Sequence, residues 1–400
     1  MQITDLSAEN KITPFLRLGF RPFFLLGAIF SILSLMIWGL YLSGYLTIDL
    51  YGGGHWWHIH EMFYGFACAI IVGFLLTAVG NWTGQRGLNG NKLLFLVLLW
   101  LLGRLVLLFP QIFGSLASAI IDISFMPLAA YFLALPIIKV KNTRNLFFIP
   151  IFIVFTVFNI QFHLVAHGSN SLNMLATSYG MMMMVTLVMS VMAGRVTPMF
   201  TANGTQTSKV EPIIALEYAT NTSIALIALS FFIHPWFSMP EIVLAILFFT
   251  AGLTQMLRWL RYKPWITFGV PLLWSLHSAL MFIWIGLIAL GIAYFSADIA
   301  KNHLWHILTI GGMAGLILAM IARVSLGHTG RPLKPAKLMS VAFAFISLAA
   351  LVRTLGPVLD ASRSVTYFNV SILCWTIAFG CFVIIYAPML TSARKDGRPG

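Results

Sequence analysis

Long apolar runs are the feature that most limits what this chain can fold into. Each has the roughly 18–25 residues that a helix needs to cross the hydrocarbon core of a bilayer. Only 9% of the 400 residues are charged, whereas a soluble domain carries roughly a quarter. We therefore predict an all-α polytopic membrane protein, a single integral membrane domain over 1–400 with cytoplasmic tails at about 1–18 and 391–400.

Basic residues between the runs predict how the chain crosses the membrane. Twelve transmembrane helices are expected, at about 19–42, 56–79, 92–109, 113–138, 146–166, 173–193, 211–233, 239–258, 268–294, 303–323, 337–355 and 367–390. With twelve helices, 20 of the 24 Lys and Arg fall on one side, and only Arg104, Lys301, Arg353 and Arg363 on the other. Loops rich in Lys and Arg stay in the cytoplasm, so both termini are expected there. The net charge of +13 thus reflects topology, and the lipid bilayer, not nucleic acid, is the expected partner.

Histidines gather at the predicted outer ends of the helices. Eight of the ten lie there if the helices alternate in direction: His55, His58, His60, His163, His167, His234, His303 and His306. Imidazole is a usual ligand of haem iron and copper. This grouping favours a metal or haem site over histidines that only hydrogen-bond to water or lipid headgroups.

The spacing of these histidines suggests more than one site. His58 and His60 are two residues apart, about 200° around a helix, so they face opposite ways and could serve two sites. Three pairs share a helix face because their members are three or four residues apart: His55 with His58, His163 with His167, and His303 with His306.

The second and tenth helices supply the candidate haem ligands. We predict one or two b-type haems near the outer face, bound in low-spin, bis-histidine form by His58, His60 and His306, with His55 and His303 as further candidates. The three cysteines form no CxxCH motif, which argues against a covalently attached c-type haem.

A second centre, holding copper or a further haem, is predicted at the end of the fifth helix. His163 and His167 lie one turn apart there, at the same depth as the other outer histidines. His58 or His60 could contribute to it from the second helix. His277, in the ninth helix, is a weaker candidate.

Charged residues inside or beside the apolar runs are further candidates, because such groups are costly in hydrocarbon. Glu61 could move protons or orient an imidazole. Asp122 and Glu217 fit either a proton or substrate path or a polar packing contact. Arg323 and Arg331 could clamp haem propionates or anionic lipid, or could simply belong to cytoplasmic loops.

Other residues near the histidines have simpler interpretations. Trp56, Trp57 and Trp305 fit an aromatic belt at the membrane interface. Gly194–Thr201 and Gly327–Pro332 follow apolar runs and are expected to be cytoplasmic connections.

Weak internal repeats link helices that are four apart. His55–Ile59 resembles His303–Ile307, and Gly80–Gly84 resembles Gly327–Gly330. The sixth and tenth helices end alike, in Arg195-Val196-Thr197 and Arg323-Val324-Ser325. Three four-helix units are therefore one possible organisation.

Several of these motifs resemble the signatures of the NnrS family. They are Gly19–Phe24, Trp57–Met62, Asn81–Gly84, Gly194–Thr201 and Arg323–Arg331. The resemblance spans nearly the whole chain. It implies a twelve-helix, haem- and copper-containing protein of the bacterial inner (plasma) membrane that relieves nitric oxide stress.

A looser similarity connects the chain with haem–copper oxidases and their nitric oxide reductase relatives. Those proteins also have twelve helices, with haem between helices two and ten near the outer face. The histidine pair that they carry on helix seven is not found here, which leaves a matching copper site open. This similarity concerns the arrangement of the fold alone.

The leading functional hypothesis is a haem enzyme that reduces nitric oxide to nitrous oxide. Two molecules of nitric oxide need two electrons and two protons, hence a redox metal, an acid and an electron donor, either a quinol or a periplasmic carrier. Haem could supply the redox metal, and Glu61 could be the acid. The alternatives are a haem-based sensor or carrier of nitric oxide without turnover, and a transporter of metal or nitrosylated complexes.

Overall fold

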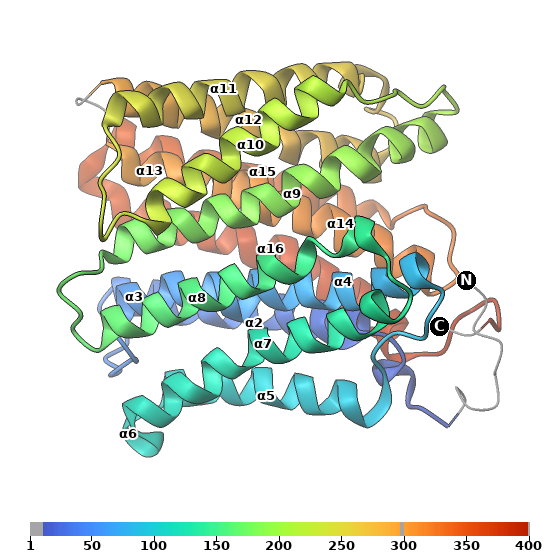
Figure 1. Ribbon diagram of the computed structural model, residues 1–400, viewed down its shortest axis with the longest axis horizontal. Coiled ribbons are helices and arrows are strands. Elements are labelled where there is room, and N and C mark those ends of the chain that lie inside the picture. The colour runs from blue at the N-terminus through green and yellow to red at the C-terminus, as the bar shows by residue number, and fades with distance from the viewer. Residues whose placement is uncertain (1–10, 297–299, 399–400) are drawn as a thin grey trace. The chain divides into compact units, whose positions relative to one another are not determined.

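Helices and short connections make up the fold in the computed structural model, which describes residues 11–296 and 300–398 (Figure 1). No strand occurs within these ranges. Twelve helical segments there are long and apolar enough to cross a membrane. The predicted all-α, multi-pass architecture is therefore confirmed, including the third and fourth spans, the shorter apolar run and the one that contains Pro127.

The helices have the following bounds. They are α2 (Phe20–Leu42), α3 (Gly54–His60), α4 (Cys68–Thr83), α5 (Gly90–Leu108), α6 (Pro110–Phe113), α7 (Ser115–Lys139), α8 (Phe148–Ala166), α9 (Met174–Thr205), α10 (Ile214–Phe232), α11 (Glu241–Arg261), α12 (Pro271–Phe295), α13 (Lys301–His306), α14 (Gly315–His328), α15 (Lys337–Leu359) and α16 (Ser364–Thr391). Short 3₁₀ turns lie at Pro14–Leu16, Thr143–Asn145, Pro264–Ile266 and Ala361–Arg363.

Two expected cytoplasmic connections are in fact helical. Gly194–Thr201 lies inside α9, which continues through Pro198 to Thr205. Gly327 and His328 are the last residues of α14, so only the residues from Thr329 onward form the turn. Hydropathy marks where a helix leaves the hydrocarbon, whereas backbone hydrogen bonding carries these two helices further.

Contacts divide the chain into two compact units. The first consists of Met1–Met174, Val324–Leu333 and Phe382–Gly400, and the second of Leu175–Arg323 and Lys334–Cys381. Helices α14 and α16 contribute residues to both. The grouping into three four-helix blocks stays a hypothesis about the sequence repeats.

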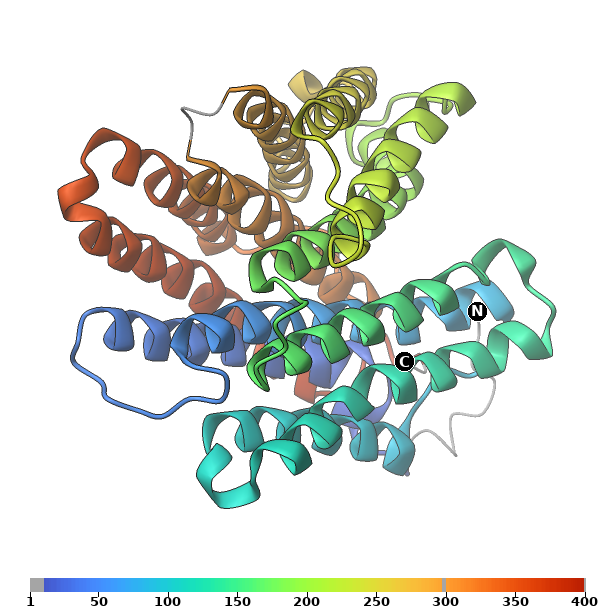
Figure 2. The ribbon, with the colours of Figure 1, turned by 60° about the vertical axis from the view of Figure 1, so that its left-hand side comes forward.

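The first unit contains the helices from α2 to α8. Helices α5 and α7 run side by side and are joined through the short α6, as both views show (Figures 1 and 2). Aromatic rings fill the space between α2 and this pair. Phe23 meets Trp100 edge-on at 6.2 Å and Phe125 at 5.9 Å between ring centroids. This packing holds α5 and α7 against the inner part of the unit.

Each histidine-bearing helix start runs directly into a π-helical segment. Helix α3 is followed by Glu61–Ala67 and then α4, and α13 is followed by Ile307–Ala314 and then α14. π-helical turns are rare and concentrate at functional sites. The shared irregularity strengthens the similarity between His55–Ile59 and His303–Ile307 that the sequence indicates.

An ion pair with a buried arginine stabilises the second unit. Arg258 of α11 is 1% exposed and holds Glu217 of α10 with two hydrogen bonds, Nε to Oε1 at 2.9 Å and Nη2 to Oε2 at 2.8 Å. A Cβ atom at position 194 would lie 2.3 Å from Arg258 Nη2, so the close approach to α9 requires Gly194. Of the two roles expected for Glu217, the packing contact is the one observed.

The C-terminal tail closes the first unit around the turn that follows α14. The backbone N–H of Lys395 donates to the carbonyl of Thr329 at 3.1 Å. Arg21 Nη1 donates to the carbonyls of Leu390 and Ser392 at 3.0 and 2.6 Å. A Cβ at Gly330 would lie within 2.6 Å of Asp396. Arg21, Thr329 and Gly330 belong to the motifs Gly19–Phe24 and Arg323–Arg331. In this structure they contact the C-terminal tail and hold it in place.

Candidate functional site

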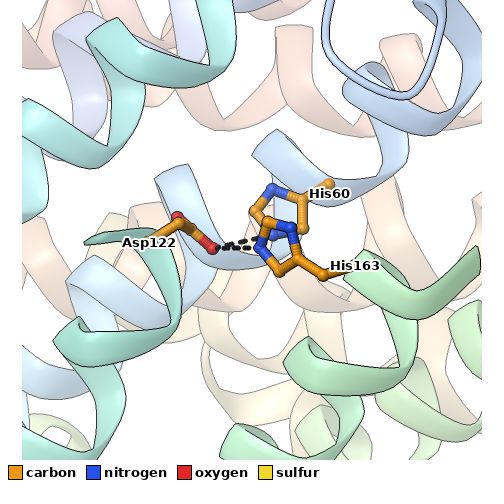
Figure 3. Close-up of side chains that lie close together, drawn as sticks. All are labelled: His60, Asp122 and His163. Atoms are coloured by element: carbon orange, nitrogen blue, oxygen red, sulfur yellow. Dashed lines mark hydrogen bonds and ion pairs between the residues drawn. The ribbon is translucent and has the colours of Figure 1, made fainter. Parts of the chain in front are cut away.

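Two imidazoles and one carboxylate converge inside the first unit. Asp122 Oδ2 lies 3.1 Å from His60 Nε2 and 3.0 Å from His163 Nε2 (Figure 3). One ligand atom from each residue falls within 4.8 Å of the others. The three come from α3, α7 and α8, and each is at most 3% exposed. This is the only group of three potential metal ligands found among the described residues.

Aromatic side chains hold His60 in position. Trp56 stacks on its ring at 4.5 Å between centroids, and Tyr64 stacks at 4.8 Å. Both are themselves held by α8, since Trp56 Nε1 donates to the carbonyl of Phe162 at 2.8 Å and Tyr64 Oη to that of Phe155 at 2.9 Å. The imidazole therefore has little freedom to rotate away from Asp122.

The other nitrogen of each imidazole also has a partner. His60 Nδ1 lies 3.0 Å from Glu61 Oε1, and His163 Nδ1 lies 2.9 Å from Tyr51 Oη. Such outer hydrogen bonds fix the ring orientation and tautomer of histidines that bind metals. The two Nε2 atoms are consequently the ones directed at the shared carboxylate.

Arg104 of α5 joins the two carboxylates of the site. Its Nη1 donates to Glu61 Oε1 at 2.5 Å, and its Nη2 donates to Asp122 Oδ1. The guanidinium is 5% exposed. A Cβ at Gly65 would clash with Phe30 Cε1 and would lie 2.9 Å from Glu61 Oε2 and 3.0 Å from Arg104 Nη1, so the packing around the pair favours glycine there. The formal charges of one arginine and two carboxylates sum to −1, which suits a bound cation or a protonated His60.

Asn159 of α8 completes the cluster. Its Nδ2 donates to Asp122 Oδ2 at 2.8 Å, and its Oδ1 lies 2.8 Å from His60 Nε2. Without a metal, both nitrogens of His60 therefore face acceptors, and a doubly protonated ring satisfies them. Asp122 thus belongs to the central cluster, whereas the sequence left its role open.

A comparison with protein families identifies the family to which the chain belongs. A family model described as NnrS protein matches residues 14–394. The chain belongs to the NnrS family. Membership suggests a role in the nitric oxide response. A search of curated proteins finds no match.

Glu61 of this NnrS-family protein comes three residues after His58, a spacing that places two side chains on one face of a helix. Its carboxylate nevertheless bonds to His60 and to Arg104. Arg104 on the neighbouring α5 attracts the carboxylate, and the helix becomes π-helical from Glu61 onward. The second oxygen, Oε2, is buried and has no hydrogen-bond partner among the described residues.

His55 and His58 lie on the opposite side of α3 from His60, as the spacing predicts. Both stack on Trp38 of α2, His58 at 4.6 Å between centroids with the rings 2° from parallel, and His55 at 6.2 Å. Helix α3 therefore presents imidazoles to α2 on one side and to α8 on the other.

His163 and His167 also share a face, and Tyr51 lies between them. Tyr51 Oη is 2.9 Å from His163 Nδ1 and 3.3 Å from His167 Nδ1. His167 Nδ1 lies 2.8 Å from the carbonyl of His163, so His167 stands at the edge of the cluster. Burial raises the pKa of Tyr51, and the charge of Asp122 raises it further. The phenol is thus protonated at neutral pH.

The histidines of α13 belong to the second unit and differ from each other. His303 Nδ1 lies 3.1 Å from Arg353 Nη1 and must accept, since arginine only donates. The proton of a neutral His303 is then on Nε2. His306 Nδ1 lies 3.1 Å from the carbonyl of Asn302 and must donate, which puts the lone pair on Nε2. This is the tautomer that a haem or metal ligand needs.

The remaining candidates are not members of the central cluster. His277 Nε2 lies 2.9 Å from Thr201 Oγ1 within the second unit. Arg323 stacks on Phe200 at 3.8 Å from the ring centroid. Arg331 Nη1 donates to the carbonyl of Thr329 at 3.2 Å.

The tryptophans beside the histidines do not form a lipid-facing belt. Trp56, Trp57 and Trp305 are 2%, 1% and 4% exposed. Trp305 stacks on Tyr179 at 4.2 Å within the second unit. The expectation of an interfacial belt was wrong because all three rings are buried inside the protein, where Trp56 stacks on His60 and Trp305 on Tyr179.

Sequence reasoning missed Arg104, Asn159 and Tyr51. Arg104 stands alone near the end of an apolar helix, and that isolation is a signal for a buried partner. Tyr51 has no comparable signal, because tyrosines near membrane ends are ordinary. Asn159 stands inside an apolar run, and a polar side chain there is itself a signal for a buried partner.

Proposed function

We propose that this protein reduces nitric oxide to nitrous oxide at a redox metal bound by His60, Asp122 and His163. The convergence of two imidazoles and a carboxylate in the protein interior carries the proposal. Imidazole with carboxylate suits copper, and two histidines with one carboxylate also suit non-haem iron. The contacts of the far ring nitrogens support a metal-binding role, because His60 Nδ1–H can donate to Glu61 Oε1 and His163 Nδ1–H to Tyr51 Oη.

Haem, which the family resemblance implies, would use other residues. His306 could bind haem iron through Nε2 because its Nδ1–H is held by a backbone carbonyl. His58 is the candidate on α3, since it lies on the opposite side of that helix from His60. Arg353 occupies the Nδ1 acceptor of His303, which makes His303 the weaker candidate. Arg323 and Arg331 remain candidates for holding propionates or anionic lipid.

The reaction sets the requirements for the chain's own residues. Two molecules of nitric oxide, two electrons and two protons give one nitrous oxide and one water. The bound metal and haem would supply the electron transfer, with electrons from a quinol or a periplasmic carrier. Nitric oxide is small and apolar and can arrive through the lipid, whereas protons need polar groups.

Glu61 is the group that we assign to hold a proton for the reaction. Its Oε1 is fixed by His60 and Arg104, while its buried Oε2 accepts no hydrogen bond within the described part of the chain and can carry a proton. Tyr51, in the connection before α3, links His163 to the partly exposed His167. This line of polar groups gives protons a route from the predicted outer side.

An anaerobic assay tests the proposal directly. Purified protein is supplied with nitric oxide and an electron donor, and nitrous oxide is measured. We expect turnover in wild type and its loss in His163→Ala, with His234→Ala as a histidine control outside the cluster. Binding of nitric oxide without nitrous oxide would refute the reductase and leave the sensor or carrier. Neither binding nor turnover would leave the transporter.

A further inference from the structure

A cavity of about 680 Å³ lies at the predicted cytoplasmic side of the first unit. The connection from α4 to α5 and the last turns of α7 line it. Three cations, Arg86, Lys92 and Lys139, are among its lining residues, and all three are exposed. No acidic residue contributes to the lining.

Carboxylates are scarce in the part of the chain that forms this cavity. Asp122 is the only acidic residue between positions 62 and 210, and Arg104, His60 and His163 engage it. None of the ion pairs of the described residues includes a cation of this cavity. Three positive side chains thus share a concave site without a negative partner from these elements, which attracts an external anion.

The start of α5 adds a second favourable element. Its N-cap residue, Asn89, makes no capping hydrogen bond with its side chain, which donates to the carbonyl of Gly87 at 2.7 Å instead. The first N–H groups of a helix bind anions readily when no side chain caps them. This helix end lies within the lining, at Gly90 and Asn91.

The same cavity has an apolar side. Phe132, Leu135 and Pro136 of the membrane-spanning α7 line it, and Leu135 is 48% exposed. A site with cations on one side and the surface of a spanning helix on the other matches an amphiphile. We infer that the cavity binds the phosphate group of an anionic phospholipid, whose acyl chains would follow α7.

Lipid binding to the full-length protein tests this inference. Delipidated protein in detergent is titrated with dioctanoyl phosphatidylglycerol, and bound lipid is counted by native mass spectrometry. Since each basic residue at such a surface contributes about fivefold to binding, Lys92→Gln/Lys139→Gln should bind about 25-fold more weakly. Lys92→Arg/Lys139→Arg should stay within about twofold of wild type, because both charges remain.

The control is Lys334→Gln/Lys337→Gln, which removes two exposed lysines from another predicted cytoplasmic connection. It should bind like wild type. Equal weakening in both Gln pairs would overturn the site, because general attraction would then explain binding. Dioctanoyl phosphatidylcholine that binds as well as phosphatidylglycerol would also overturn it. Displacement of the lipid by an equal concentration of inorganic phosphate would assign the site to a soluble anion and reject the lipid.

Discussion

Arg104 offers the sharpest test of how the central cluster is held together. Its guanidinium donates to Glu61 and Asp122, both at most 2% exposed, and no other arginine or lysine pairs with either carboxylate among the described residues. In Arg104→Gln the two carboxylates lose two charge-assisted hydrogen bonds, worth roughly 1.5–3 kcal/mol each. Breaking a buried pair from one side costs about 3–5 kcal/mol. We therefore expect a loss of about 3–5 kcal/mol in the free energy of unfolding.

Equilibrium unfolding in mixed micelles with sodium dodecyl sulfate measures this loss. The double variant Glu61→Gln/Arg104→Gln removes one charge of each sign and should recover a large part of it. Arg363→Gln is the control, because its pair with Asp360 is 74% exposed on the arginine side and such pairs contribute about 0–1 kcal/mol. A loss no larger than that of Arg363→Gln would refute the reasoning. So would a double variant whose loss equals the sum of the two single losses.

Four further outcomes follow from the same geometry. His58→Ala and His306→Ala should each lose haem or change its spin state, and unchanged absorption spectra in both would remove them as ligands. Glu61→Gln keeps an acceptor oxygen, so metal content should persist while nitric oxide consumption falls by roughly 100-fold or more; unchanged consumption would remove Glu61 from the mechanism. Because the pKa of Tyr51 is raised in the folded protein, its contribution to stability is constant below about pH 10 and falls as pH rises above it. Tyr51→Phe should lack that part of the alkaline loss, and parallel stability curves would contradict this. A reporter fused at Gly87 should report the cytoplasm, and an external signal would mean a miscounted helix.

Much of the fold could be predicted because the length of each apolar run, a local property of the sequence, determines where a spanning helix lies. Apolar length alone locates the twelve spans, and residue spacing places His58 and His60 on opposite sides of α3. The helix ends were less predictable, as α9 shows, because hydropathy does not report where backbone hydrogen bonding stops.

The central cluster could be predicted only in part. Single residues such as Glu61 and His163 stand out beside apolar runs, but their partners lie far away in the sequence. Arg104 is 43 residues from Glu61, and Asp122 is 41 residues from His163. Spacing along one helix cannot supply such pairs. Asp122 and Arg104 are each the lone charged residue within an apolar run, which is a signal for a buried partner, but nothing in the sequence pairs them with each other or with Glu61.

The most direct test of the central claim is the metal content of the purified protein. Wild type, His163→Ala and the control His234→Ala are loaded anaerobically with copper or ferrous iron, washed, and analysed for metal per protein. The account predicts one tightly held metal beyond haem iron in wild type and in the control, and its loss in His163→Ala. Equal metal content in all three proteins, or none beyond haem iron in wild type, would contradict it.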